Sequence, residues 1–162
     1  MTMTIDMHTH VAPRQAVKIA ESGGKWHGVE FYRDKNDKLT TSYGDLEMSL
    51  PWPKKMETPD ERLSSMDARK IDMHILSISP LMHWHGLDNT NAVAYAKDVN
   101  DDISDYTSIN GNRFKSFCFL PLQDPKASVI ELERCVNSKK MLGAMVATCL
   151  LYTSDAADDS LR

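Results

Sequence analysis

Two histidines separated by one residue, His8 and His10, are the first side chains in the sequence that could do chemistry; they lie in the stretch "TIDMHTHVAP" (4–13). Imidazole is a good ligand for zinc and related divalent ions. In a β-strand, residues i and i+2 point to the same face, so the pair could direct both rings at one ion. Two partly exposed histidines in a loop are the alternative. The position of the pair at the end of a strand expected at 4–7 favours the metal site.

The elements that must position this pair alternate between strand and helix along the chain. Strands separated by helices imply right-handed crossovers and a parallel sheet. No Gly-rich phosphate loop follows the first strand, which weighs against a nucleotide-binding doubly wound sheet. Four strands would make half of a (β/α)₈ barrel, whose chemistry sits at the carboxyl ends of its strands, or most of a small doubly wound sheet. The expected strands are 4–7, 71–79, 113–122 and 141–148, and the expected helices are 14–21, 58–70, 89–109 and one that starts at Pro125 behind an Asp124 cap.

Side-chain patterns also predict how these helices begin, end and pack. Thr58 followed by Glu61 is a capping box, with Pro59 at the first helical position. Gly111 fits the C′ position after the helix at 89–109. The residues expected on buried helix faces are Leu63 and Met66, then Ala92, Ala96, Val99, Ile103 and Tyr106, and finally Val129, Leu132 and Val136.

Residues 23–57 interrupt the alternation with several glycines and prolines. We interpret them as an excursion within a domain at 1–148 and expect one hairpin, formed by 28–34 and 38–44. Trp26, His27 and Trp52 could belong to a flap over the mouth of a barrel or to a plain surface hairpin.

Composition excludes several classes of protein. The 162 residues are 41% hydrophobic and 26% charged, with a net charge of −4, so neither nucleic acid nor an anionic membrane is expected as a partner. No apolar run approaches the roughly 20 residues of a membrane span, and the first residues do not resemble a signal peptide. Three cysteines without CxxC spacing predict a reduced, cytoplasmic protein.

The stretch "IDMHTHVAP" resembles the opening metal motif of the amidohydrolase superfamily. Three further segments narrow the resemblance to the branch of aminocarboxymuconate semialdehyde decarboxylase-like, metal-dependent decarboxylases and hydrolases. They follow in the order and spacing of that family and, with the opening motif, cover most of residues 4–148. The segments are "ERLSSMDARKIDMHILSISP" (61–80), "NRFKSFCFLPLQDP" (112–125) and "ELERCVNSKKMLGAMVAT" (131–148).

The resemblance implies the N-terminal half of a (β/α)₈ TIM barrel, truncated after about four parallel strands. It also implies one divalent metal, zinc or alternatively manganese, with His8 and His10 as its first two ligands. The family's remaining metal-site residues, histidines at the fifth and sixth strands and an aspartate near the eighth, have no position in this sequence. The family's substrate-binding arginine has no clean match in 23–57 either, where Lys54 and Lys55 are more simply solvated charges.

Other candidate residues are weighed against simpler roles. His83, Trp84 and His85 form a second HxH pattern just after the second expected strand, and they could line the substrate pocket or an ordinary loop. His74 lies inside that strand and is expected to be a core histidine. Cys118 and Cys135 are expected to be small buried residues.

The end of the sequence differs from the family. Residues 149–158, "CLLYTSDAAD", match one reading frame of a transposon-type sequencing adapter. We therefore expect 149–162 to be a non-native tail with few contacts to the rest, and the natural protein to continue with four more strands. A 162-residue chain is also short for such a barrel, which typically needs about 250 residues.

For the parent protein, these observations predict a metal-dependent carboxy-lyase that decarboxylates an aromatic or unsaturated carboxylic acid. A hydrolase of an amide or lactone on the same scaffold is the first alternative. The second is that the chain as given is an inactive metal-binding fragment. The expected partner is the small carboxylic acid substrate, and a homo-oligomeric parent is left open.

Overall fold

The structure is a computed structural model that describes residues 2–49, 58–84 and 86–146. Several sequence-based expectations fall outside these ranges. They concern Trp52, Lys54, Lys55, His85, Cys149 and the tail at 149–162.

A parallel sheet forms the centre of the molecule. Its strands are β1 (Ile5–Val11), β6 (Met73–Ile78) and β7 (Phe114–Ser116), hydrogen-bonded in the order β1-β6-β7. Each strand pairs with the one before it in the sequence, and the sheet grows at one edge. Barrels are built in this way. In a doubly wound sheet the strand order reverses at one point, so that later strands add at the other edge. The expected parallel half-barrel is therefore confirmed.

The strand boundaries differ from the expected ones. β1 runs through Val11, so both histidines of the opening motif lie within the strand, not after it. β7 is shorter than expected, and the expected strand at 141–148 is reduced to a parallel bridge between Cys118 and Ala144. There the backbone N–H of Cys118 donates to the carbonyl of Gly143 over 2.8 Å. The segment expected to form the fourth strand therefore runs parallel to the chain just after β7, but its described part pairs there through a single bridge.

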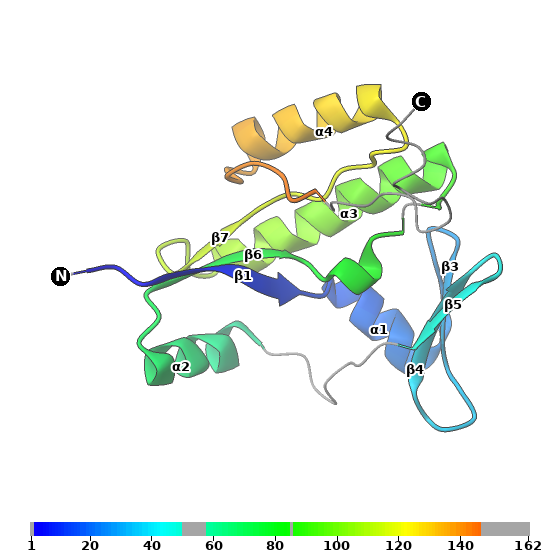
Figure 1. Ribbon diagram of the computed structural model, residues 1–162, viewed down its shortest axis with the longest axis horizontal. Coiled ribbons are helices and arrows are strands. Elements are labelled where there is room, and N and C mark those ends of the chain that lie inside the picture. The colour runs from blue at the N-terminus through cyan, green and yellow to red at the C-terminus, as the bar shows by residue number, and fades with distance from the viewer. Residues whose placement is uncertain (1, 50–57, 85, 147–162) are drawn as a thin grey trace, which may run out of the picture.

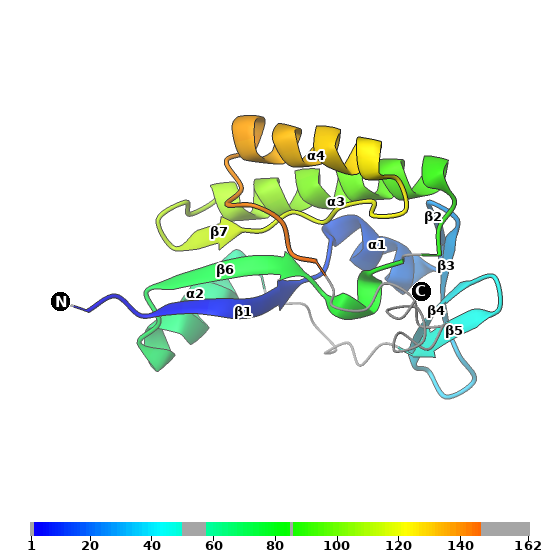
Figure 2. The same cartoon turned by 45° about the horizontal axis from the view of Figure 1, so that its top comes forward.

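Helices surround this sheet. In Figure 1, α3 and α4 lie on one side of the strands and α1 and α2 on the other, and Figure 2 shows α4 stacked alongside α3. The four helices are α1 (Arg14–Ser22), α2 (Pro59–Arg69), α3 (Asn89–Ser108) and α4 (Pro125–Ser138), and a short 3₁₀ helix, η1 (Pro80–Met82), follows β6. In the described part of the chain, no helix has the length and apolarity needed to cross a membrane.

The predicted start of α2 is confirmed. The backbone N–H of Glu61 donates to the Thr58 hydroxyl over 3.3 Å, and the backbone N–H of Thr58 donates to the Glu61 carboxylate over 2.9 Å. These reciprocal bonds satisfy two donors that a helix N-terminus leaves without an intrahelical acceptor. On the inner face Met66 is fully buried, and Arg62, unexpectedly, is buried as well.

The buried stripe of α3 follows the predicted spacing. All five predicted positions are buried, and Tyr95 and Asn100 join them. The helix ends where expected, with Ser108 as its last residue and Ile109 as its cap in right-handed helical conformation, but the expected C′ role of Gly111 is wrong. Gly111 lies in the following turn and does not adopt a positive φ, so no left-handed cap forms there.

The predicted inner face of α4 is wrong for two of its three residues, whereas the third, Leu132, packs partly buried against the core. Val129 is 58% exposed and Val136 is 40% exposed, whereas Ser128, Glu131 and Cys135 are buried. Polar bonds fix this rotation of the helix. The Asn100 amide donates to the Glu131 carboxylate over 2.7 Å, and Arg134 donates two hydrogen bonds to the same carboxylate. An unpaired buried carboxylate costs more free energy than burial of two valine side chains gains. The hydrogen bonds of Glu131 therefore favour this orientation of the helix over one that buries Val129 and Val136.

The excursion at 23–57 is more regular than expected. The predicted hairpin is present as β3 (Val29–Arg33) and β4 (Leu39–Tyr43), and β2 (Gly24–Trp26) and β5 (Leu46–Ser49) extend it to an antiparallel sheet of four strands. This sheet lies beyond the carboxyl ends of β1 and β6 (Figures 1 and 2). Trp26 anchors it, because its buried indole packs edge-on against Tyr95 of α3 with ring centroids 4.9 Å apart. Trp26, Val29 and Phe31 thereby belong to the same core as the helices and the parallel sheet.

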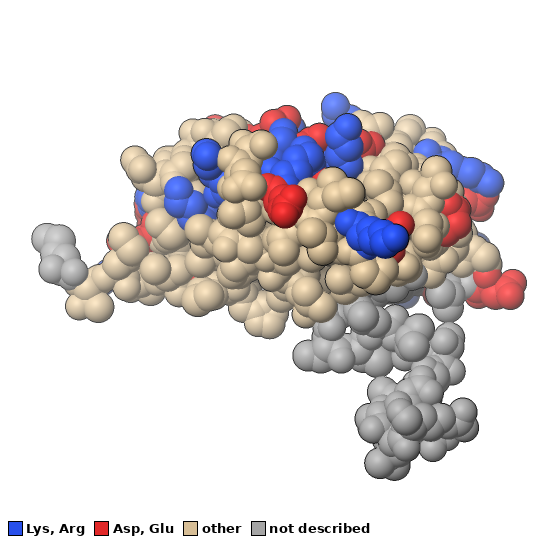
Figure 3. All heavy atoms as spheres, turned by 90° about the horizontal axis from the view of Figure 1, so that it is seen from above, with Lys and Arg blue, Asp and Glu red and all other residues tan. Residues whose placement is uncertain are grey.

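Charges of both signs intermingle on the surface. On the face that carries α4, lysines and arginines alternate with acidic side chains above a broad uncharged band (Figure 3). On this face no single-sign patch of the kind that binds nucleic acid is present among the described residues.

Candidate metal centre

His8 and His10 lie side by side near the carboxyl end of β1. Their ring centroids are 5.1 Å apart and the ring planes are nearly perpendicular, at 87°. Thr9, between them, points to the opposite face, where its hydroxyl accepts a hydrogen bond from Arg62 of α2. The strand therefore presents both imidazoles on the face that α2 does not cover, as the spacing predicts.

Hydrogen bonds hold the two histidines from both sides. The Nδ1 atom of His10 lies 3.0 Å from the hydroxyl of Ser77, its neighbour on β6. The backbone N–H of His8 donates to the Asp6 carboxylate over 3.0 Å. A partner on one ring nitrogen fixes the tautomer and orientation of a metal-binding histidine. Ser77 is therefore placed to orient His10, with Nε2 as the nitrogen that could coordinate an ion.

The protonation state of His10 suits a metal ligand. Burial, and then the neighbouring His8, lower the pKa of the His10 imidazole below its ordinary value. At neutral pH the ring is therefore neutral and has a lone pair to donate, which metal coordination requires.

The histidine pair does not extend to a larger cluster of candidate ligands among the described residues. Among 2–49, 58–84 and 86–146, no group of three or more His, Cys, Asp or Glu side chains could hold an ion. Zinc sites typically use three or four protein ligands. The chemistry of the paired imidazoles fits a divalent ion as two ligands of such a larger set.

The family model for amidohydrolases matches residues 5–162. The chain belongs to the amidohydrolase family. It is 37% identical to γ-resorcylate decarboxylase from Rhizobium radiobacter over 91 residues, which are 56% of this chain and 28% of that enzyme. It is 25% identical to 2-amino-3-carboxymuconate-6-semialdehyde decarboxylase from Dictyostelium discoideum over 152 residues, which are 91% of this chain and 41% of that enzyme. The amidohydrolase chain thus spans less than half the length of these relatives.

Solved structures agree with this assignment. The crystal structure of 2,6-dihydroxybenzoate decarboxylase from Rhizobium superimposes with a TM-score of 0.60 at 27% identity, over 90% of this chain and 38% of that one. Dihydroxybenzoic acid decarboxylase from Polaromonas sp. JS666, solved with bound manganese and the inhibitor 2-nitroresorcinol, gives a TM-score of 0.63 at 24% identity, over 90% of this chain and 38% of that one. The second comparison shows a shared fold. Together they show that the amidohydrolase chain covers part of a barrel.

The second HxH pattern of the amidohydrolase chain lies after β6. His83 caps η1, is half-buried, and packs on the ring of Phe119 with centroids 5.2 Å apart. Trp84 is only 5% exposed and belongs to the hydrophobic core. His85 lies outside the described residues. His83 and Trp84 are thus joined to the aromatic core near the end of β7, and their contact with a substrate stays a prediction.

Three residues expected in the core are found there. His74 is buried, and its Nε2 lies 3.9 Å from the Asp6 carboxylate. Cys118 and Cys135 are both buried free thiols. None of them extends the histidine pair into a larger metal site.

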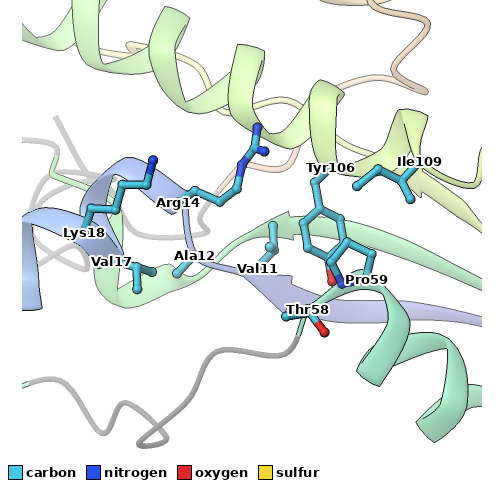
Figure 4. Close-up of a pocket in the computed structure, with 9 residues that line it drawn as sticks. All are labelled: Val11, Ala12, Arg14, Val17, Lys18, Thr58, Pro59, Tyr106 and Ile109. Carbon is cyan, nitrogen blue, oxygen red and sulfur yellow. The ribbon is translucent and has the colours of Figure 1, made fainter.

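A pocket lies on the opposite side of β1 from the histidine rings. It lies between the end of β1, the first turns of α1 and α2, and the end of α3 (Figure 4). Its cavity volume is about 270 Å³. Its lining residues are Val11, Ala12, Arg14, Val17, Lys18, Thr58, Pro59, Tyr106 and Ile109. Arg14 also pairs with Asp102 over 2.6 Å, so its charge is already neutralised. The pocket is therefore separate from the candidate metal centre.

Two residues of this region, Arg62 and Ser77, were missed by the sequence analysis. Arg62 occupies the same face of α2 as Met66, one turn earlier, which could have marked it as buried. Ser77 faces the same way as His10 only because β1 and β6 pair in this register. No local pattern in the sequence shows that register.

Proposed function

We propose that His8 and His10 are two ligands of one divalent metal in a decarboxylase that acts on an aromatic or unsaturated carboxylic acid. The observation that carries the proposal is the placement of the two imidazoles on one face at the carboxyl end of β1, with ring centroids 5.1 Å apart. Chemistry in (β/α)₈ barrels sits at this end of the strands. The names of the relatives favour decarboxylation over hydrolysis of an amide or lactone, which remains the alternative on this scaffold.

The metal, when bound, would supply Lewis-acid polarisation of groups beside the departing carboxylate. The described residues of the chain would bind and orient the ion. His8 and His10 would hold the ion, and Ser77 would keep the His10 ring in its orientation through the 3.0 Å contact at Nδ1. We propose zinc or manganese as the ion. Manganese is the ion bound in the Polaromonas enzyme.

We further propose that His83, Trp84 and His85 contribute to the substrate pocket. They follow η1 after the carboxyl end of β6, the strand that pairs with β1. Of the two described members of this group, the half-buried His83 is more accessible to a ligand than Trp84. Trp84, buried in the core, would support it from behind.

The test uses the chain extended by the C-terminal part of a barrel, with metal content and carbon dioxide release from 2,6-dihydroxybenzoate as measurements. His8→Ala and His10→Ala should each remove most metal and most turnover, because even residues that only orient metal ligands typically contribute roughly 10–100-fold. His83→Ala is the matched control; it should retain metal and change substrate affinity. Full metal occupancy in the double variant His8→Ala/His10→Ala would contradict the proposal.

A further inference from the structure

Arg62 of α2 is a buried cation whose bonds converge on the histidine pair. Its residue is 7% exposed. The guanidinium donates to the Thr9 hydroxyl over 2.9 Å, to the backbone carbonyl of His10 over 3.0 Å, and to the Tyr106 hydroxyl over 3.1 Å. We infer that Arg62 is a positioning residue that fixes the segment His8–His10 for metal binding. The inference rests on the proposed function.

The energetics of burial explain why these bonds matter. A guanidinium taken out of water must have its N–H groups satisfied, because an unsatisfied buried donor costs about 1–3 kcal/mol and more when it is charged. Arg62 places two of the three hydrogen bonds described above on adjacent residues of β1, Thr9 and His10. Moving this strand segment would leave those donors without acceptors. The burial of Arg62 therefore penalises displacement of the histidines.

The segment needs this support because its ladder to β6 is irregular. The register of β1 against β6 shifts between Asp6 and Thr9, so the irregularity falls at Met7 and His8 and includes the first histidine of the pair. Farther along, the carbonyl of Val11 accepts from Ser79, on the β6 side. Because alternate carbonyls of a strand point to opposite edges, the carbonyl of His10 points away from β6. Arg62 supplies the donor that no strand supplies there among the described residues.

The helix holds Arg62 rigidly at this point. The capping box of Thr58 and Glu61 fixes the first turn of α2, directly beside Arg62. Met66, one turn later on the same face, is fully buried in the core. The side chain thus reaches β1 from an element anchored on both sides of it.

Arg62 acts on the face of β1 opposite to the imidazole rings. Thr9 points toward it, and His8 and His10 point away. A substrate at the rings would therefore not touch the guanidinium. Its hydrogen bonds therefore act on the rings through the backbone of the strand.

The experiment compares Arg62→Met with Arg69→Met, a control on the exposed last turn of the same helix. The first measurement is metal-free: the NMR cross-relaxation between the His8 and His10 ring protons in the 162-residue chain. The second is a Zn²⁺ titration of the same samples. Arg62→Met should lose the ring–ring signal and bind Zn²⁺ roughly 10–100-fold more weakly, whereas Arg69→Met should match the unaltered chain. Arg62→Lys should restore part of the affinity, because an ammonium group can reach one acceptor but lacks the fork of the guanidinium.

Two outcomes would overturn the inference. One is a folded Arg62→Met chain, by circular dichroism, that keeps the ring–ring signal and a Zn²⁺ affinity within about twofold of the unaltered chain. The other applies if Arg62→Met does not fold. In that case, an unchanged ring–ring signal and unchanged Zn²⁺ affinity in both Thr9→Val and Arg62→Lys would overturn the inference. Failure of the proposed function has a different signature. In that case His8→Ala/His10→Ala would leave Zn²⁺ binding unchanged, while the metal-free effect of Arg62 would persist.

Discussion

His8 and His10 gain their properties from residues that lie far away in the sequence. Ser77 on β6 orients the His10 ring, and Arg62 on α2 holds its backbone. At the scale of single residues, the contacts from Ser77 and Arg62 thus organise the two histidines that we propose as metal ligands. Such organisation lowers the cost of binding.

The titration of His10 tests this organisation. Burial and the nearby His8 lower its pKa, so the folded protein takes up this proton less readily than the unfolded chain does. The stability that His10 contributes should be complete above the unfolded pKa of about 6.5 and should decrease as pH falls from there toward the folded pKa. An NMR titration of the His10 ring should give a pKa below 6.5, and His8→Ala should raise it. A His10 that titrates at or above 6.5 would contradict the geometry.

At the scale of elements, polar contacts decide how the helices sit on the sheet. Asn100 of α3 donates to the backbone carbonyl of Phe119 and accepts from its N–H, both over 2.8 Å. The same side chain donates to Glu131 of α4. One buried amide thus links two helices to the segment that follows β7.

Glu131 should make the packing of α4 pH-dependent. Burial alone would raise its pKa, but hydrogen bonds from Arg134 and Asn100 outweigh it, and the pKa lies below its ordinary value. A carboxyl group of this kind stabilises the fold above its unfolded pKa, and the contribution disappears as pH falls through the folded pKa. The free energy of unfolding should therefore drop as the pH is lowered below about 4.3.

Urea unfolding at a series of pH values measures this effect. Glu131→Gln should flatten the acidic part of the profile. Glu133→Gln, at an exposed position of the same helix, is the control and should leave the profile as it is. The interpretation fails if both variants behave alike.

At the scale of the whole molecule, apolar side chains remain exposed at both sides of the sheet. Ile5 and Met7 on β1 are 45% and 60% exposed, and Leu142 and Val146, which flank the bridge at Ala144, are 52% and 51% exposed. In a closed barrel, strands and helices cover such positions. The exposure agrees with a chain that spans 38% of the Rhizobium barrel enzyme.

The printed chain alone should therefore show no decarboxylase or hydrolase turnover. Among the described residues, nothing completes the ligand set that His8 and His10 begin. Carbon dioxide release from a panel of aromatic acids, with Zn²⁺ or Mn²⁺ added, is the assay, and the extended chain is its positive control. Turnover by the purified 162-residue chain would refute this expectation.

The sequence by itself determined the features that depend on neighbouring residues. The i, i+2 spacing placed both histidine rings on one face, and the box of Thr58 and Glu61 fixed the start of α2. The alternation of strands and helices led to the parallel sheet, because short-range periodicity distinguishes strands from helices, and the resemblance to the amidohydrolase branch led to the half-barrel. The metal-ligand role of the histidines and the non-native tail remain predictions.

Only the tertiary structure decided the features that depend on partners. The sequence predicted Val129 and Val136 on the inner face of α4, but that face of the helix carries Glu131, which accepts hydrogen bonds from Asn100 and Arg134. From its neighbours in the sequence, Arg62 would be predicted to be an exposed surface charge. Its hydrogen-bond acceptors Thr9 and Tyr106 lie 53 and 44 residues away along the sequence. Such pairings depend on register and packing between elements, because a buried polar group is stable only where its partners meet in space.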